Sequence, residues 1–238
     1  MPRTATLCEK IFYCVSRPLV LGYTSSILKM DVQRFDLLPP GPAIIAANHP
    51  STTDPFYVAG MLRRQSFILI KDLLFQVPVL GEYLRRSGHI AVEAGRGEAA
   101  LTVAAERLRA GHTVIIFPEG MLSPVEGGCA QARTGVARLA LMSGAPVVPV
   151  GIHLKMDRAH VFESNVKGQV EMSRWYFRGP YHLTVGRPMQ FAGDHNDRPH
   201  VRQIADTVMQ RIMELAHDSE RRMNDRLPMQ GMMPGITA

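Results

Sequence analysis

Short apolar runs alternate with helix-like stretches along most of this chain, and this alternation limits the folds available to it. Strand-like runs are found at residues 43–47, 66–70, 88–92, 113–117, 146–152 and 181–186, and helical stretches near 55–63, 78–86, 97–110, 134–143 and 197–217. Strands that are apolar throughout are buried on both faces. The pattern therefore predicts an α/β fold, a mainly parallel sheet with helices on both faces, preceded by an N-terminal helical segment.

The chain has 238 residues, 46% of them hydrophobic, and no linker-like stretch divides it. We therefore expect one main domain over residues 37–220, with residues 157–180 as an irregular insertion. Residues 1–36 are predicted to be helical, and residues 221–238, rich in Met, Pro and Gly, to form a mobile tail. The apolar stretch 11–28 is interrupted by Arg17 and Pro18, so it predicts either an interfacial helix or an ordinary element capping the core rather than a membrane span.

The formal net charge of +6 favours acidic partners, such as anionic lipid, the phosphates of coenzyme A or an acidic acyl carrier protein. The paired arginines lack interleaved aromatic residues, so nucleic acid is not an expected partner. Three cysteines without a Cys-x-x-Cys pair suit a reducing cytoplasm. The nine histidines show no metal-ligand spacing, so neither a metal nor a cofactor is expected.

Residues 48–54 read Asn-His-Pro-Ser-Thr-Thr-Asp and place His49 five positions before Asp54. The run 43–47 is strand-like, so His49 leaves the carboxyl end of a strand, where α/β folds form sites, and Asp54 opens the next helix. Imidazole titrates near neutral pH, and a carboxylate on its far nitrogen fixes the tautomer. The pair therefore predicts a general base for acyl transfer to a hydroxyl or amine. The alternative is that Asp54-Pro55 is only a helix start.

A second block, Phe117-Pro118-Glu119-Gly120, follows another predicted strand and should lie at the same sheet edge as His49. The structural alternative for Glu119 is a turn carboxylate. Acyl transfer also needs donors for the oxyanion, for which we expect backbone N–H groups and the side chain of Asn48 or Ser51. A thiol nucleophile at Cys129 is not needed if the acceptor itself attacks the thioester.

From about Gly41 to Gly151 the chain resembles the glycerolphosphate and lysophosphatidate acyltransferases, whose hallmark is a His-x4-Asp pair. Four blocks carry the resemblance in order: 48–55, 71–93, 117–120 with 133–135, and 145–150. The resemblance implies catalytic roles for His49 and Asp54 and an acceptor-binding role for Glu119 and Gly120. It also implies that Pro149 lies in a block shaping the acyl or acceptor site.

The chain departs from the family pattern at two places. Met121-Leu122 stands where the family usually has Thr-Arg, and Ala94 where it usually has an arginine. Both arginines are candidates for holding an acceptor phosphate, and apolar side chains cannot replace that grip. Their absence predicts an acceptor without a phosphomonoester, unless Arg96 or Arg133 reaches the same phosphate.

The sequence thus predicts an acyltransferase of specialised metabolism that uses acyl-CoA or acyl carrier protein as donor and a small-molecule or lysolipid acceptor. One alternative is a conventional 1-acylglycerol-3-phosphate acyltransferase of phospholipid synthesis. Another, of a different class, is an inactive module that binds lipid or carrier protein. The expected location is the cytoplasm, with a possible peripheral position on the inner face of the membrane.

Overall fold

The computed structural model describes residues 5–62, 64–166 and 169–225 of the chain. Within them, one sheet has the strand order β1-β9-β6-β2-β5-β3-β4. Its members are β1 (Met30–Arg34), β2 (Ala43–Ala47), β3 (Ser66–Lys71), β4 (Ile90–Val92), β5 (Thr113–Ile116), β6 (Val147–Leu154) and β9 (Tyr181–Val185). Neighbouring strands run parallel except β6 and β9. The predicted mainly parallel α/β sheet is confirmed.

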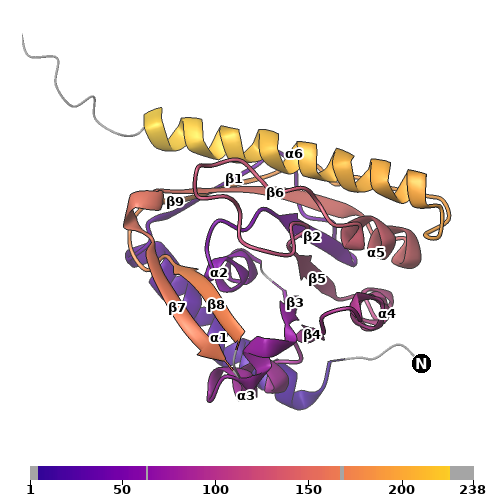
Figure 1. The fold of residues 1–238 in the computed structure, drawn as a ribbon, viewed down its shortest axis with the longest axis horizontal. Helices are drawn as coiled ribbons and strands as arrows, with labels where there is room; N and C mark the ends of the chain where they lie inside the picture. The colour runs from indigo at the N-terminus through magenta and orange to yellow at the C-terminus, as the bar shows by residue number, and fades with distance from the viewer. Residues whose placement is uncertain (1–4, 63, 167–168, 226–238) are drawn as a thin grey trace, which may run out of the picture.

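Helices pack on both faces of this sheet (Figure 1). The helices of the described residues are α1 (Leu7–Ser26), α2 (Asp54–Met61), α3 (Leu80–Arg86), α4 (Gly97–Arg109), α5 (Gly135–Ser143) and α6 (Arg198–Asp225), and α1 packs against α2 and α3. Short 3-10 turns, Asp72–Gln76 and Met156–Arg158, join some of the other elements.

Strand β2 shows why its sequence is apolar throughout. Ile44 and Ala46 belong to a core shared with α4, α5 and α6, whereas Ala43, Ile45 and Ala47 belong to a second core that includes residues of α2. Successive side chains of a strand point to opposite faces, so both faces of β2 lie under helices. Each large aliphatic side chain buried in this way contributes roughly 1.5 to 3 kcal/mol. The two cores hold the ends of the strands, and thus the loops that follow them, in place.

The N-terminal segment differs from the sequence prediction at its end. Residues 30–34, expected to be part of a helical segment, form β1 and pair in parallel with β9. The strand was overlooked because its partner lies about 150 residues later in the chain, and edge pairing of this kind leaves little local pattern.

The insertion and the tail also differ from the sequence prediction. Residues expected to be irregular form an antiparallel hairpin of β7 (His160–Val166) and β8 (Gln169–Trp175). Helix α6 continues to Asp225, into the segment expected to be a tail, because residues such as Met223 pack against the body of the protein and are buried. Residues 226–238 lie outside the described residues.

Helix α1 begins with a capping box, in which Thr6 caps the helix and Glu9 bonds back to the Thr6 backbone. Glu9 is buried and forms an ion pair of 2.6 Å with Arg107 of α4. Arg17 donates from Nε to the carbonyl of Leu62 at 3.2 Å. These contacts fix α1 to the domain. None of the helices in the described ranges has both the length and the apolar character needed to cross a membrane.

Candidate active site

Two loops leave the same edge of the sheet and build the site. β2 and β5 are adjacent parallel strands, so the segments after them, which carry His49 and Glu119, emerge side by side. The loops are joined directly: the backbone N–H of Ser123 donates to the His49 carbonyl at 2.8 Å, and the His49 N–H donates to the Ser123 hydroxyl at 3.0 Å. The topology thus brings together the two blocks that the sequence singled out.

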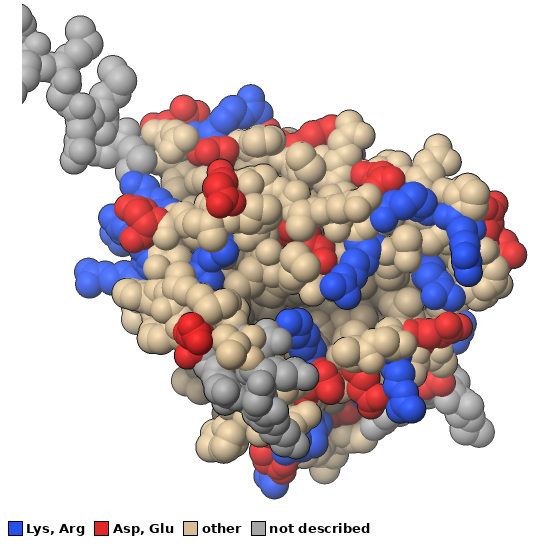
Figure 2. All heavy atoms as spheres, in the orientation of Figure 1, with Lys and Arg blue, Asp and Glu red and all other residues tan. Residues whose placement is uncertain are grey.

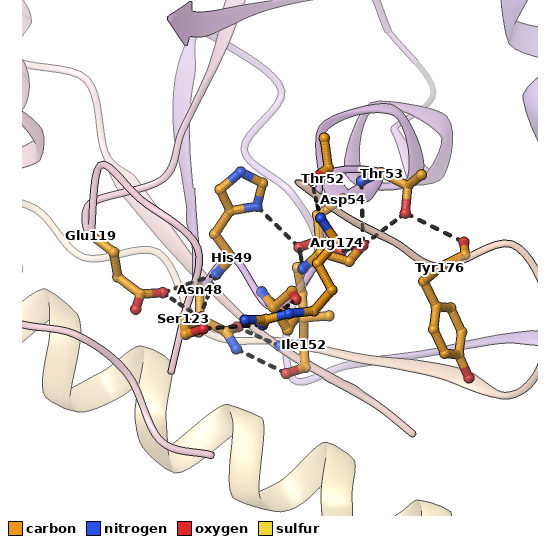
Figure 3. Close-up of polar contacts among 12 residues, drawn as sticks. Asn48, His49, Thr52, Thr53, Asp54, Glu119, Ser123, Ile152, Arg174 and Tyr176 are labelled. Atoms are coloured by element: carbon orange, nitrogen blue, oxygen red, sulfur yellow. Dashed lines mark hydrogen bonds and ion pairs between the residues drawn. The ribbon is translucent and has the colours of Figure 1, made fainter. Parts of the chain in front are cut away.

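His49 and Asp54 form a hydrogen-bonded pair (Figure 3), with Nδ1 of His49 3.1 Å from Oδ2 of Asp54. The Asp54 side chain is fully buried, whereas the His49 side chain retains 18% exposure. The His49 ring stacks on Phe117, with centroids 4.3 Å apart. Nε2 of His49 makes no hydrogen bond with any residue the structure describes, so this nitrogen is left to exchange a proton with another molecule.

The carboxylate of Asp54 is held by groups from two parts of the chain. The N–H and hydroxyl of Ser51 donate to it at 2.7 and 2.9 Å, and the hydroxyl of Tyr181, at the start of β9, donates at 2.8 Å. Burial, and secondly the charge of Asp54, raises the pKa of Tyr181 well above its ordinary value, so the phenol stays protonated as a donor. Asp54 also begins α2, where the helix dipole favours a carboxylate.

Glu119 is almost completely buried, and both its oxygens accept hydrogen bonds from the protein. Oε1 accepts from the His49 N–H at 2.9 Å and from the Ser123 hydroxyl at 2.6 Å, and Oε2 accepts from the Ala130 N–H at 2.6 Å. The carboxylate therefore fixes the loop that carries His49. This geometry matches a structural role at least as well as the acceptor-binding role implied by the resemblance.

The predicted oxyanion donors are already used within the protein. The Asn48 side chain exchanges two hydrogen bonds with the backbone of Ile152 in β6, at 2.9 and 2.7 Å. The Ser51 hydroxyl donates to Asp54. Both side chains support the loop between β2 and α2, and backbone N–H groups are left as the predicted oxyanion donors.

The two predicted acceptor-binding arginines occupy different places. Arg96 is exposed and pairs with Glu93 at 3.3 Å, on the surface. Arg133 packs against Gly120, where an added Cβ would lie 2.6 Å from the arginine Nε. Gly120 has a φ of +66°, which favours glycine. Of the two arginines, only Arg133 lies against the Glu119 loop.

Sequence reasoning missed Ser123, Arg174 and Tyr181. Ser123 lies four residues after Glu119, so its place in the motif was a usable signal. Arg174 and Tyr181 come from the hairpin and from the strand that follows it, more than 100 residues from His49, and no local pattern identifies them. Arg174 donates from Nη1 to the carbonyls of Pro50 and Ser123, at 2.9 and 3.1 Å.

Other reactive side chains of the region are not arranged for catalysis. Burial, and secondly the charge of Glu119, raises the pKa of Cys129 to about 12, which keeps its thiol protonated and weakly nucleophilic. No group of three or more His, Cys, Asp or Glu side chains that could hold a metal ion occurs among the described residues.

Comparisons with known proteins agree with this architecture. A family model described as Acyltransferase matches residues 29–153. The 1-acyl-sn-glycerol-3-phosphate acyltransferase of Pseudomonas aeruginosa is 32% identical over 127 residues, which are 52% of this chain and 49% of that protein. The enzyme of the same name from Limnanthes alba is 30% identical over 119 residues, 47% of this chain and 42% of that protein. The match thus spans about half the length of these curated relatives.

A solved structure shares the fold. The crystal structure of PlsC, the 1-acyl-sn-glycerophosphate (LPA) acyltransferase from Thermotoga maritima, aligns with a TM-score of 0.60 and 22% identity over 92% of this chain and 81% of that one. The family match covers the His49 and Glu119 blocks and both core strands β2 and β5. The chain belongs to the acyltransferase family of the glycerolphosphate and lysophosphatidate acyltransferases.

Proposed function

We propose that this protein transfers an acyl group from a thioester to the free hydroxyl of a 1-acylglycerol 3-phosphate. The observation that carries the proposal is the His49–Asp54 pair, in which a buried and fully hydrogen-bonded carboxylate orients an accessible imidazole. The names of the relatives favour this conventional acceptor over an acceptor without a phosphomonoester.

In the proposed reaction, Nε2 of His49 takes the proton of the acceptor hydroxyl while its oxygen attacks the thioester carbonyl carbon. Asp54 stabilises the imidazolium that forms and keeps Nδ1 protonated. The tetrahedral intermediate then collapses, the carbon–sulfur bond breaks, and the imidazolium returns the proton to the departing thiolate. Ester and free thiol are the products, and no covalent enzyme intermediate is needed.

The acyl donor is either acyl-CoA or acyl carrier protein, both of which are acidic and suit the net charge of +6. Figure 2 shows one face of the molecule hollowed near its centre, with Lys and Arg side chains gathered along one side of the hollow. An apolar pocket lies next to the His49 loop and is lined by Thr52, Pro55, Phe56, Ile70, Leu74, Leu80, Leu84 and Trp175. These apolar walls suit the first carbons of an acyl chain.

A membrane surface is the proposed source of the lipid acceptor. Leu7, Ile11, Val15 and Leu19 recur every fourth residue along α1 and are 52 to 75% exposed. The opposite side of the helix carries the polar contacts of Glu9 and Arg17 described above. A helix with its apolar stripe turned outward is suited to lie in a membrane interface, and we propose a peripheral position on a cytoplasmic membrane face.

An acceptor screen tests the proposal. Purified protein is given one long-chain acyl-CoA, and free thiol release is followed with lysophosphatidate, with an uncharged monoacylglycerol, or with no acceptor. Thiol release that depends on lysophosphatidate, with phosphatidate as product, supports the proposal. Release with monoacylglycerol alone points to the acceptor without a phosphomonoester. No release with any acceptor, despite binding of acyl-CoA, points to the inactive binding module.

A further inference from the structure

Arg174 of β8 is a buried arginine that has no acidic partner in the described ranges. It is 8% exposed, and no ion pair joins it to any of the residues that the structure describes. Arg107, which is also buried, pairs with Glu9 at 2.6 Å. The nitrogens of Arg174 are absent from the buried side-chain atoms without a hydrogen-bond partner, so the part of its charge that no carbonyl holds stays open to solvent, on the loop that carries His49. An unpaired cation in this position is suited to an anionic ligand.

The position of Arg174 is fixed by its backbone (Figure 3). Its N–H donates to the Thr52 hydroxyl at 2.9 Å, and its carbonyl accepts from the Thr52 N–H at 2.6 Å. Nη1 of Arg174 then bridges the carbonyls of Pro50 and Ser123, one in each loop of the site. The guanidinium is thus held beside the residue that follows His49, and little ordering remains to be done when a ligand binds.

The rest of the guanidinium is available to a ligand. An arginine has five N–H donors in a rigid fork, and the two on Nη1 match the two carbonyls that it contacts. Nε and Nη2 make no hydrogen bond with the described part of the chain. Parallel N–H groups of a guanidinium fit two oxygens of a phosphate, and each charge-assisted bond is stronger than a neutral one.

We propose that Arg174 binds the phosphate of the acceptor, an inference that rests on the proposed function. In a 1-acylglycerol 3-phosphate the phosphate is carried by the carbon next to the one that bears the reacting hydroxyl. Arg174 is bonded to the carbonyl of Pro50, the residue after His49, so its guanidinium lies on the same loop as the imidazole that would take the proton of this hydroxyl. The phosphates of an acyl-CoA are at the far end of its pantetheine arm. Leu122, which stands where the family usually has an arginine, is followed by Ser123. Because Arg174 donates to the Ser123 carbonyl, it places a cation on the loop from which that arginine is missing.

The test compares Arg174→Gln with the wild type in steady-state kinetics. The KM for lysophosphatidate should rise about 10- to 100-fold, the range expected for loss of charge-assisted hydrogen bonds. The KM for acyl-CoA should change by less than about twofold, and any fall in kcat should be smaller than the rise in the KM for lysophosphatidate. Arg178→Gln, at an exposed arginine shortly after β8, is the matched control and should leave all three unchanged.

Three results would overturn the inference. A fall in kcat with an unchanged KM for lysophosphatidate would make Arg174 a structural clamp of the two loops. A higher KM for acyl-CoA that disappears with acyl-pantetheine, which lacks the nucleotide phosphates, would assign Arg174 to the donor. An unchanged KM for both substrates would show that Arg174 does not bind the phosphate of the acceptor. If the wild type does not use lysophosphatidate at all, the proposed function fails instead.

A second variant, Arg174→Lys, keeps the inference testable if Arg174→Gln does not fold. Lysine keeps the charge but not the fork, so the KM for lysophosphatidate should rise less than in Arg174→Gln, again without a change for acyl-CoA. If neither variant folds, the arginine is a structural element and the inference is wrong.

Discussion

At the scale of single residues, the proposed base, His49, depends on the carboxylate of Asp54, which already accepts hydrogen bonds from several groups of the protein. Asp54 accepts three hydrogen bonds from Ser51 and Tyr181 in addition to its contact with His49. A buried carboxylate that accepts this many hydrogen bonds has little freedom to turn. The orientation of His49 is therefore set before any substrate arrives, which is the condition for electrostatic stabilisation without reorganisation.

The variant Asp54→Asn tests whether the carboxylate of Asp54 orients His49 for catalysis. The amide cannot stabilise an imidazolium and favours the wrong tautomer of His49, so kcat should fall at least about 100-fold. Tyr181→Phe removes only one donor to the carboxylate, at a cost of about 1 kcal/mol, and should lower kcat much less. Steady-state thiol release measures both. Equal losses in the two variants would contradict the assignment of Asp54 as the orienting group.

The lowered pKa of His89 leads us to expect that the stability of the fold depends on pH, independently of catalysis. Burial, partly opposed by the charge of Glu9, lowers the pKa of His89 from its ordinary 6.5 to about 4. Between these values the unfolded chain binds a proton that the folded chain does not, so the free energy of unfolding should decrease as pH falls from about 6.5 to about 4. His89→Gln should flatten that decrease in urea unfolding series. The exposed His217→Gln is the control, and an unchanged slope in His89→Gln would contradict the prediction.

At the scale of elements, the predictable parts are those with a strong local pattern. β2 is apolar throughout because helices cover both its faces, β3 and β5 are mostly apolar, and the helix from Gly97 shows clear periodicity. The hairpin was missed although β8 alternates Val170 and Met172 with polar neighbours, a signal of period two that was available. β1 was missed because its pairing with β9 is a contact between distant segments.

The exposed apolar side chains of α1, among them Ile11 and Val15, are expected to contact a membrane. Ile11→Glu with Val15→Glu should reduce binding to anionic vesicles at least about tenfold, because each apolar side chain inserted into a bilayer contributes roughly 1.5 to 3 kcal/mol. Both side chains are more than half exposed, so the fold should persist. Met213→Glu on α6, where the methionine is 37% exposed, is the control. Unchanged vesicle sedimentation of the double variant would show that the stripe does not face lipid.

At the scale of the whole molecule, the site is assembled from segments that only the complete fold brings together. His49, Asp54 and Glu119 could be predicted, because each follows a strand or opens a helix near the same sheet edge. Arg174 and Tyr181 could not, because the hairpin and β9 reach the His49 loop only through the tertiary packing of the C-terminal part of the chain. The sequence predicts the side chain of Asn48 or Ser51 as an oxyanion donor, whereas a long-range contact with Ile152 and a local bond to Asp54 occupy these side chains.

The central claim, that His49 is the base of an acyl transfer, is tested most directly by free thiol release from acyl-CoA with lysophosphatidate and purified His49→Ala. The exposed His217→Ala serves as the control. The expected result is a loss of about 100- to 10,000-fold in kcat for His49→Ala, the range for removal of a general base, with the fold retained. Thiol release within about tenfold of the wild type by folded His49→Ala would contradict the mechanism.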